Sequence, residues 1–319
     1  MPQHSFYNIG ISGSPWQAKE KQQWLSAQVR IRSYQNEVVS VLQSLAEQFD
    51  LIEYGALSID VNRYPLFALT TKNWDANKAV MLITGGVHGY ETSGVHGAIQ
   101  FMANHASRYT EQYNIVALPC ISPWAYEHIV RWNPYTVDPN RSFHSNSPSQ
   151  EAHDAMQFIQ SLDGKILLHI DLHETTDSDE SEFRPALAAR DGETFTVESI
   201  PDGFYLVGDS ENQQSTFQQA IIDNVRHVTH IAPPDDKGQI IGSDMQGEGI
   251  IYYPLKKLGL CASMTNAPYT TTTEVYPDSP QVNADDCNRA QVTAVTAAFE
   301  YISSTHTSSG CSQNSCNDR

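Results

Sequence analysis

Two histidines and two glutamates lie close behind predicted strands, where they could bind a metal ion and catalyse hydrolysis. His88 and Glu91 follow one apolar run, His173 ends a second, and Glu274 lies in the last strand candidate. A catalytic zinc ion takes three protein ligands with nitrogen or oxygen donors and keeps one position open for water. His88, Glu91 and His173 supply those three ligands, so the sequence predicts one catalytic Zn2+ ion.

The HGYE stretch at 88–91 suits a turn that leads into a helix, because a three-residue gap there brings both side chains to one point. Gly85 and Gly86 let the backbone bend before it. So short a pattern also arises by chance in a chain of this length, so it is a weak signal by itself. The third ligand must arrive from another strand.

A second histidine competes for the third ligand position. His169 and His173 share side-chain parity on the strand 165–172, but His169 lies four residues back, about 13 Å deeper. We therefore predict that His173 is the ligand and that His169 is structural, as is His96 on the helix that follows Glu91. Asp171, between the two histidines, is expected to point to the opposite face.

Other hydrolase and nucleotide-binding motifs are missing from the sequence. There is no GxSxG nucleophile elbow and no GxxxxGK[ST] phosphate loop. The acidic run Asp177, Asp179, Glu180 and Glu182 is most simply a solvated loop. The alternative interpretation is a second metal site in this run, assisted by Glu174.

The composition indicates a globular protein and excludes some partners. Of 319 residues, 40% are hydrophobic, and 19 Lys and Arg against 37 Asp and Glu give a net charge of −18, which would repel nucleic acids and anionic membrane surfaces. No apolar run approaches the roughly 20 residues that span a bilayer. The N-terminus lacks a signal-peptide pattern, so we expect a cytoplasmic protein. The five cysteines include no CxxC pair and are interpreted as reduced thiols.

Strand and helix patterns alternate along the chain. The runs are a strand at 79–84, a helix at 91–105, a strand at 113–118, a helix at 149–162 and a strand at 165–172. This alternation predicts an α/β fold with a mixed, largely parallel central sheet and helices on both faces. Functional residues in such folds lie beyond the carboxyl ends of the strands. We expect one catalytic domain over residues 1–302 and a disordered tail over 303–319.

Four motifs in a fixed order resemble the zinc carboxypeptidase family, including its shorter bacterial members. They are GGVHGYE, DPNRSF, IDLHE and TTTTEVYP, and the resemblance extends over roughly residues 33–302. It implies a zinc carboxypeptidase-like fold with His88, Glu91 and His173 as the zinc ligands. It also implies that Glu274 is the general base and that Arg131 stabilises the developing oxyanion.

The same resemblance implies the residues that bind the substrate. Asn140 and Arg141 match the Asn-Arg pair that grips the terminal carboxylate, and Tyr252 matches the mobile tyrosine that covers the bound C-terminal residue. Arginine suits this role because its planar fork binds a carboxylate bidentately. The implied activity is that of a metallocarboxypeptidase that hydrolyses the C-terminal peptide bond.

A second interpretation remains open. The related N-acyl amino acid amidohydrolases, of the aspartoacylase and succinylglutamate desuccinylase type, share the HxxE motif, the Asn-Arg pair and the later histidine, and their substrate would be a small acyl-amino acid. The long segment 200–264 favours peptides, because it is large enough to shape a side-chain pocket. Its acidic residues Asp209, Glu211 and Asp244 favour a basic or polar C-terminal residue. A catalytically inactive binding module is disfavoured by the presence of Glu274.

Overall fold

The computed structural model describes residues 6–310, which build a central eight-stranded sheet. In spatial order its strands are β1 (Phe49–Ala56), β2 (Pro65–Thr71), β4 (Asn114–Leu118), β3 (Val80–Gly85), β5 (Ile166–Glu174), β10 (Tyr269–Val275), β6 (Tyr205–Asp209) and β9 (Ile250–Tyr253). The central pairs β4–β3, β3–β5 and β5–β10 are parallel, as is β6–β9. The pairs β1–β2, β2–β4 and β10–β6 are antiparallel. The predicted mixed, largely parallel sheet is confirmed.

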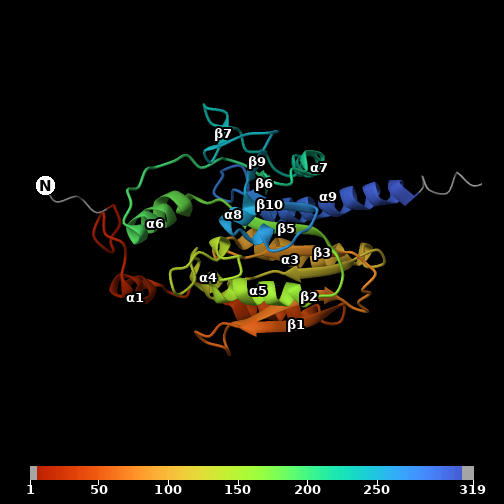
Figure 1. The fold of residues 1–319 in the computed structure, drawn as a ribbon, viewed down its shortest axis with the longest axis horizontal. Helices are drawn as coiled ribbons and strands as arrows, with labels where there is room; N and C mark the ends of the chain where they lie inside the picture. Colours follow the sequence, from red (N-terminus) through yellow and green to blue (C-terminus); the bar gives the residue numbers. More distant parts are fainter. Residues whose placement is uncertain (1–5, 311–319) are drawn as a thin grey trace, which may run out of the picture.

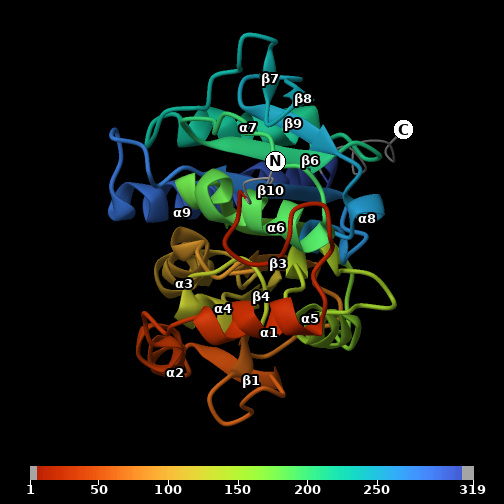
Figure 2. The same cartoon turned by 90° about the vertical axis from the view of Figure 1, so that its left-hand side faces the viewer.

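Helices cover both faces of this sheet (Figure 1). The helices are α1 (Ala18–Ala27), α2 (Ser40–Ser44), α3 (Thr92–Asn104), α4 (Pro123–His128), α5 (Gln150–Gln160), α6 (Arg184–Asp191), α7 (Ser215–Val225), α8 (Leu255–Leu258) and α9 (Ala284–Gly310). One apolar core joins α3, α7 and α9 to the sheet, and a second core joins α5 to the opposite face. A short hairpin of β7 (Gln239–Ile240) and β8 (Ser243–Asp244) projects beyond β9 (Figure 2).

The central strand β3 delivers the chain to the functional end of the sheet. Its residues from Val80 to Gly85 are all buried, as expected for a strand with neighbours on both edges and helices on both faces. The chain then turns at Gly86, whose φ is +59°. At Gly89 the backbone packs so closely on α4 that an added Cβ would lie 2.0 Å from the carbonyl carbon of Ala125. These two glycines allow the loop between β3 and α3 to fold tightly.

The final helix is longer than predicted. We expected it to end near Ile302 and the chain to be disordered from residue 303, but α9 continues to Gly310. Serine side chains do not end the helix because their hydroxyls bond back to carbonyls of the same helix, as Ser303 does to Phe299 (2.8 Å). Residues 311–319 of the expected tail lie outside the described part of the chain. Within residues 6–310, no helix combines the length and apolar character that crossing a bilayer requires.

Candidate metal centre and active site

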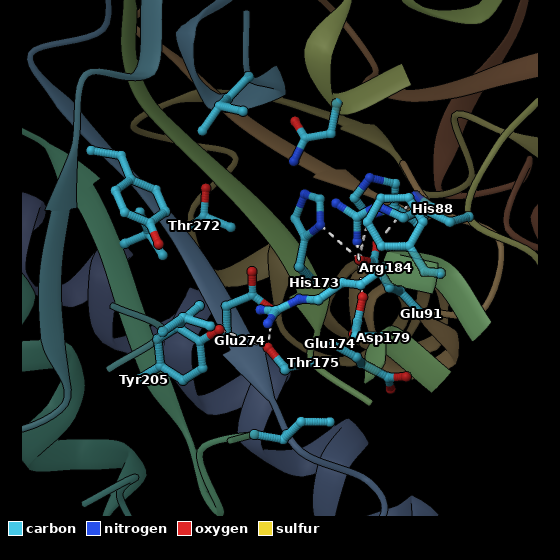
Figure 3. Close-up of a pocket in the computed structure, with 18 of the residues that line it drawn as sticks. His88, Glu91, His173, Glu174, Thr175, Asp179, Arg184, Tyr205, Thr272 and Glu274 are labelled. Carbon is cyan, nitrogen blue, oxygen red and sulfur yellow. Dashed lines mark hydrogen bonds and ion pairs between the residues drawn. The ribbon is translucent and has the colours of Figure 1, made fainter. Parts of the chain in front are cut away.

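Three predicted ligand residues meet at the carboxyl end of the sheet. His88 Nδ1 lies 2.6 Å from Glu91 Oε1, and His173 Nδ1 lies 2.9 Å from the same oxygen (Figure 3). One potential ligand atom from each residue lies within 4.8 Å of the other two, and all three residues are at most 2% exposed. The structure therefore brings together the trio that the sequence selected.

Adjacent parallel strands explain this meeting. Gly85 at the end of β3 is paired with Leu172, so the loop that carries His88 and Glu91 lies next to the end of β5, where His173 lies. Glu91 is the residue that precedes the first turn of α3. The carboxyl ends of parallel strands meet at one edge of a sheet, which is why a motif after β3 and a residue ending β5 can share one site.

An aspartate is hydrogen-bonded to Nε2 of each histidine ring. His88 Nε2 lies 3.0 Å from Asp138 Oδ1, and His173 Nε2 lies 2.7 Å from Asp171 Oδ2. A carboxylate that accepts a hydrogen bond from Nε2 leaves the Nδ1 lone pair for a metal. Asp171 does not point to the opposite face as we expected, because residues two apart on a strand project from the same face.

The electrostatics of the trio favour an added positive charge. Burial lowers the pKa of His173, but Asp171 and Glu91 outweigh burial and raise this pKa well above its ordinary value. For Glu91, burial alone would raise the pKa. The two neighbouring histidines together have the larger effect and lower the pKa of Glu91 to about 2. Two nitrogen donors and one carboxylate oxygen fit a catalytic zinc ion, and their carboxylate partners complete its usual surroundings. Among the described residues no second cluster of possible metal ligands occurs.

His169 lies apart from this group. Its Nε2 is 3.0 Å from the hydroxyl of Thr84 on β3, and burial lowers its pKa to about 4. A buried, neutral histidine bonded to a threonine is structural, which agrees with the choice of His173 as the third member of the trio.

Glu274 faces the same cavity, which has a volume of about 200 Å³ and is also lined by the trio. On β10 it is paired with His173 of β5, so the two side chains leave the sheet on one face. Thr175 donates a hydrogen bond to Glu274 Oε2 (3.0 Å), and burial raises the pKa of Glu274 to about 7 (Figure 3). A carboxyl group with a pKa near neutrality can both accept and donate a proton.

Arg131 is a positively charged wall of the cavity, fixed on several sides. Its Nε donates to Asp138 (3.1 Å), and its Nη1 donates to the Tyr90 hydroxyl (2.6 Å) and to Asp179 (3.2 Å). The guanidinium lies 4.1 Å from the ring centre of Phe183. Nη2 has no hydrogen-bond partner within residues 6–310, so this nitrogen is available to a substrate oxygen.

Asp179 corrects the interpretation of the acidic run. We expected a solvated loop, but Asp179 begins a π-helical turn (Asp179–Phe183), is buried and lines the cavity. Its carboxylate accepts from Arg131 and Tyr90, and these partners offset the cost of burial. Composition showed the acids but not which of them folds inward.

Asn140 and Arg141 both line the cavity from a short turn after Asp138. Asn140 Oδ1 accepts from the backbone nitrogen of Cys261 (2.7 Å), which fixes the amide side chain. Arg141 Nη1 donates to the carbonyl of Asn140 (2.7 Å). Two of the three predicted substrate-binding residues therefore lie in the same cavity as the trio.

Tyr252 does not reach the cavity, whereas the next residue does. Tyr253 lines the cavity, together with Val207 of the neighbouring strand. Tyr252 points to the other face, where an added Cβ on Gly208 would lie 2.6 Å from its ring. Successive side chains on a strand alternate between faces, so Tyr252 and Tyr253 lie on opposite faces of β9. The predicted acids Asp209, Glu211 and Asp244 also lie outside the cavity lining.

Arg32, from the N-terminal part of the chain, holds the loop that carries two of the trio. Its guanidinium donates to the carbonyl of Gly89, to the carbonyl of Tyr126 (2.7 Å) and to the hydroxyl of Thr92 (2.7 Å). It also stacks 3.6 Å from the ring centre of Tyr126. Sequence reasoning gave Arg32 no role, since no spacing links it to the HGYE stretch.

Two further residues, Glu174 and Gln291, connect helices α3 and α9 to the strand ends at the site. Glu174 accepts hydrogen bonds from the backbone nitrogens of Thr92 (3.1 Å) and Ser93 (2.7 Å) at the start of α3, and burial raises its pKa to about 7. Gln291 of α9 donates to the carbonyl of His173 (2.8 Å) and accepts from Thr273 (2.6 Å). These contacts tie the helices to the strand ends that carry the polar site.

The central part of the chain matches the model of one known protein family. Residues 77–194 match the model of the succinylglutamate desuccinylase/aspartoacylase catalytic domain. This segment contains the trio and the Asn-Arg pair, but not Glu274. A comparison with curated protein sequences gave no match.

Solved structures share the fold. A candidate metallopeptidase from Shewanella amazonensis superposes with a TM-score of 0.61 at 16% identity, covering 82% of this chain and 91% of its own. A metallo-carboxypeptidase from Burkholderia cenocepacia gives 0.57 at 14%, covering 85% and 69%. One from Pseudomonas aeruginosa, in complex with (2-guanidinoethylmercapto)succinic acid, gives 0.55 at 13%, covering 84% and 68%. The fold is that of the zinc carboxypeptidases, and the resemblance to them and to their desuccinylase relatives is confirmed.

Proposed function

We propose that this protein is a zinc-dependent metallocarboxypeptidase that hydrolyses the C-terminal peptide bond of its substrate. The family match and the carboxypeptidase-like fold support a metal-dependent hydrolase. The proposal is carried by one observation: His88, Glu91 and His173 share a single cavity with Glu274 and Arg141. We also propose that residues 1–302 act as one catalytic domain.

His88 and His173, through Nδ1, and Glu91, through its carboxylate, would hold the zinc ion. A zinc ion in such a site polarises a carbonyl and lowers the pKa of water towards 7. Asp138 and Asp171 keep the two imidazole rings oriented through their Nε2 atoms.

Glu274 is the proposed general base and acid. Its carboxylate takes a proton from the attacking water and then delivers a proton to the leaving nitrogen. The hydrogen bond from Thr175 holds Oε2, which leaves Oε1 to accept the proton. Nη2 of Arg131 would stabilise the negative charge that develops on the carbonyl oxygen, because its other nitrogens are already bonded to protein groups.

Arg141 and the amide of Asn140 would bind the free carboxylate of the substrate. A guanidinium forms two parallel hydrogen bonds with a carboxylate, which fixes both the position and the direction of the substrate. Tyr253 takes the covering role that the motif match gave to Tyr252, because it is the tyrosine of this pair that lines the cavity.

The match of residues 77–194 favours a second candidate, an N-acyl amino acid amidohydrolase. Such an enzyme would use the same trio and the same Arg141, since its substrates also carry a free carboxylate. The two activities differ in the group on the other side of the broken amide bond.

One incubation separates the candidates. The purified protein with zinc is mixed with a peptide library, N-acetylaspartate and succinylglutamate, and products are identified by mass spectrometry, with Glu274→Gln as the inactive control. Loss of single C-terminal residues is expected. Cleavage of the acyl-amino acids with intact peptides would establish the amidohydrolase, and no cleavage of any substrate would refute both.

A further inference from the structure

The turn of the β7–β8 hairpin contains a residue that does not suit it. Ile240 pairs with Ser243, so Ile241 and Gly242 form a two-residue turn, with φ values of +43° and +70°. Such turns favour Asn or Asp followed by Gly, because both positions need positive φ. Isoleucine is β-branched, and a β-branched residue at positive φ is strained.

The side chain of Ile241 lies on the active-site cavity. It lines the same space as Glu274 and Arg141 and packs on the apolar cluster that includes Val207 and Leu260. Gly242 is different, because a Cβ added there would meet nothing within 4 Å. One position of the turn therefore faces the cavity and the other faces open space.

Packing alone does not account for isoleucine at this position. Asparagine would relieve the backbone strain, and Ile241 is only half-buried in the free protein. Strained residues cluster at ligand-binding sites, where a bound group supplies the contacts that the free protein lacks. A substrate side chain placed in the cavity would bury the exposed part of Ile241.

We infer that Ile241 is a specificity-determining residue, which contacts the side chain of the substrate residue that bears the free carboxylate. This inference rests on the proposed function. Val207, Ile241 and Leu260 form an apolar wall of the cavity, and Arg141 lies in the same cavity to bind the carboxylate. The site therefore takes an apolar side chain, in contrast to the basic or polar one that Asp209, Glu211 and Asp244 suggested.

Binding of free amino acids tests this inference without turnover. Calorimetry on the zinc-loaded protein compares L-leucine and L-phenylalanine with L-glutamine, and a thermal melt gives the stability of each variant. The wild type should bind the apolar amino acids at least tenfold more tightly than L-glutamine. Ile241→Asn should lose about tenfold in affinity for L-leucine and change little for L-glutamine, while its melting temperature rises by about 2 °C.

Two control variants complete the test. Gly242→Asn changes the same turn outside the cavity and should keep the wild-type affinities. Ile241→Val keeps both the strain and most of the apolar surface, so it should keep most of the preference for L-leucine. Replacing a strained turn residue that contacts the ligand should raise stability and lower selectivity. Replacing a core residue cannot give this combination.

Three results would overturn the inference: equal affinity of the wild type for L-leucine and L-glutamine, no detectable binding of either, or unchanged selectivity in Ile241→Asn. A lower melting temperature of Ile241→Asn would also overturn it, since Ile241 would then be a core residue. Selective L-leucine binding by a protein that cleaves no peptide would leave this inference standing and refute the proposed function.

Discussion

The two sides of the cavity are built from different kinds of chain. The side proposed to bind metal, called the metal side below, consists of the loop after β3 and the end of β5. Its residues His88, Glu91 and His173 are nearly inaccessible and bonded to one another. The opposite side consists of the hairpin and the short strand β9, whose residues Ile241 and Tyr253 are half-buried. Buried strand ends hold polar groups in one arrangement, whereas turns can present different side chains without disturbing the sheet. Chemistry and selectivity can therefore change independently in this fold.

Removing a ligand from the metal side should have the largest effect. His173→Ala should reduce bound zinc from one ion per chain to nearly none and reduce activity to background, because three protein ligands are needed. His169→Ala is the matched control, since the ring nitrogens of His169 lie near the hydroxyls of Thr84 and Thr265 and not near the trio. Metal analysis of the purified variants decides the matter: zinc retained by the first and lost by the second would reverse the assignment.

Glu274→Gln should be the next largest effect. The substitution keeps the shape of the side chain and its hydrogen bond with Thr175 but removes the proton acceptor, so kcat should fall by about 10² to 10⁴ with zinc retained. Glu211→Gln, which replaces an exposed acid outside the cavity lining, should leave kcat unchanged. Near-normal turnover of the zinc-loaded Glu274→Gln protein would exclude the proposed mechanism.

Burial of a carboxyl group on the metal side should make stability depend on pH. The pKa of Glu174 is raised from 4.5 to about 7, so the folded protein holds this proton more tightly than the unfolded chain does. The free energy of unfolding should therefore fall as the pH rises from about 4.5 through 7, by about 3 kcal/mol for this group.

Glu174→Gln removes this titration, so the stability of the variant relative to the wild type should increase by that amount over the same pH range. Denaturant unfolding of the metal-free proteins at several pH values measures the difference. The exposed Glu193→Gln should show no such trend. A difference that is constant with pH would mean that Glu174 is already ionised in the fold.

The smallest expected effect is that of replacing Arg32, which holds the loop between β3 and α3. Arg32→Met removes three hydrogen bonds, to the loop, to α3 and to α4, so zinc affinity should weaken by about tenfold. Competition with a chromophoric chelator measures this affinity, and Arg30→Met, which replaces an exposed arginine, is the control. Equal affinities in the two variants would show that the loop needs no support from Arg32.

The sequence predicted which residues meet at the carboxyl end of the sheet, because strand ends obey simple rules. His88 and Glu91 follow an apolar run that ends in two glycines, which places them at one edge of a parallel sheet. A second apolar run places His173 at the same edge. Glu274 was selected from its place in the last strand candidate and from the TTTTEVYP motif. The pairing of its strand with β5 is visible only in the structure.

The other residues depended on details that a pattern does not contain. Tyr252 and Tyr253 are adjacent on one strand, and the sequence does not show which of them faces the cavity. Asp179 is buried because a π-helical turn carries it to Arg131 and Tyr90, contacts between segments far apart in the sequence. Ile241 is recognisable only from its φ value and its position on the cavity, neither of which composition reveals.

The place of β10 in the sheet sets an order of events while the protein is being synthesised. β10 is the last strand to leave the ribosome, yet it lies between β5 and β6, so until it is made the sheet consists of two unconnected parts. The residues proposed to bind zinc come from β3 and β5 and emerge much earlier. Because a domain generally folds as a unit, the complete sheet can form only after β10 has been made. Under the proposed mechanism, a chain without β10 lacks its general base Glu274, so hydrolysis would begin only once this final strand is in place.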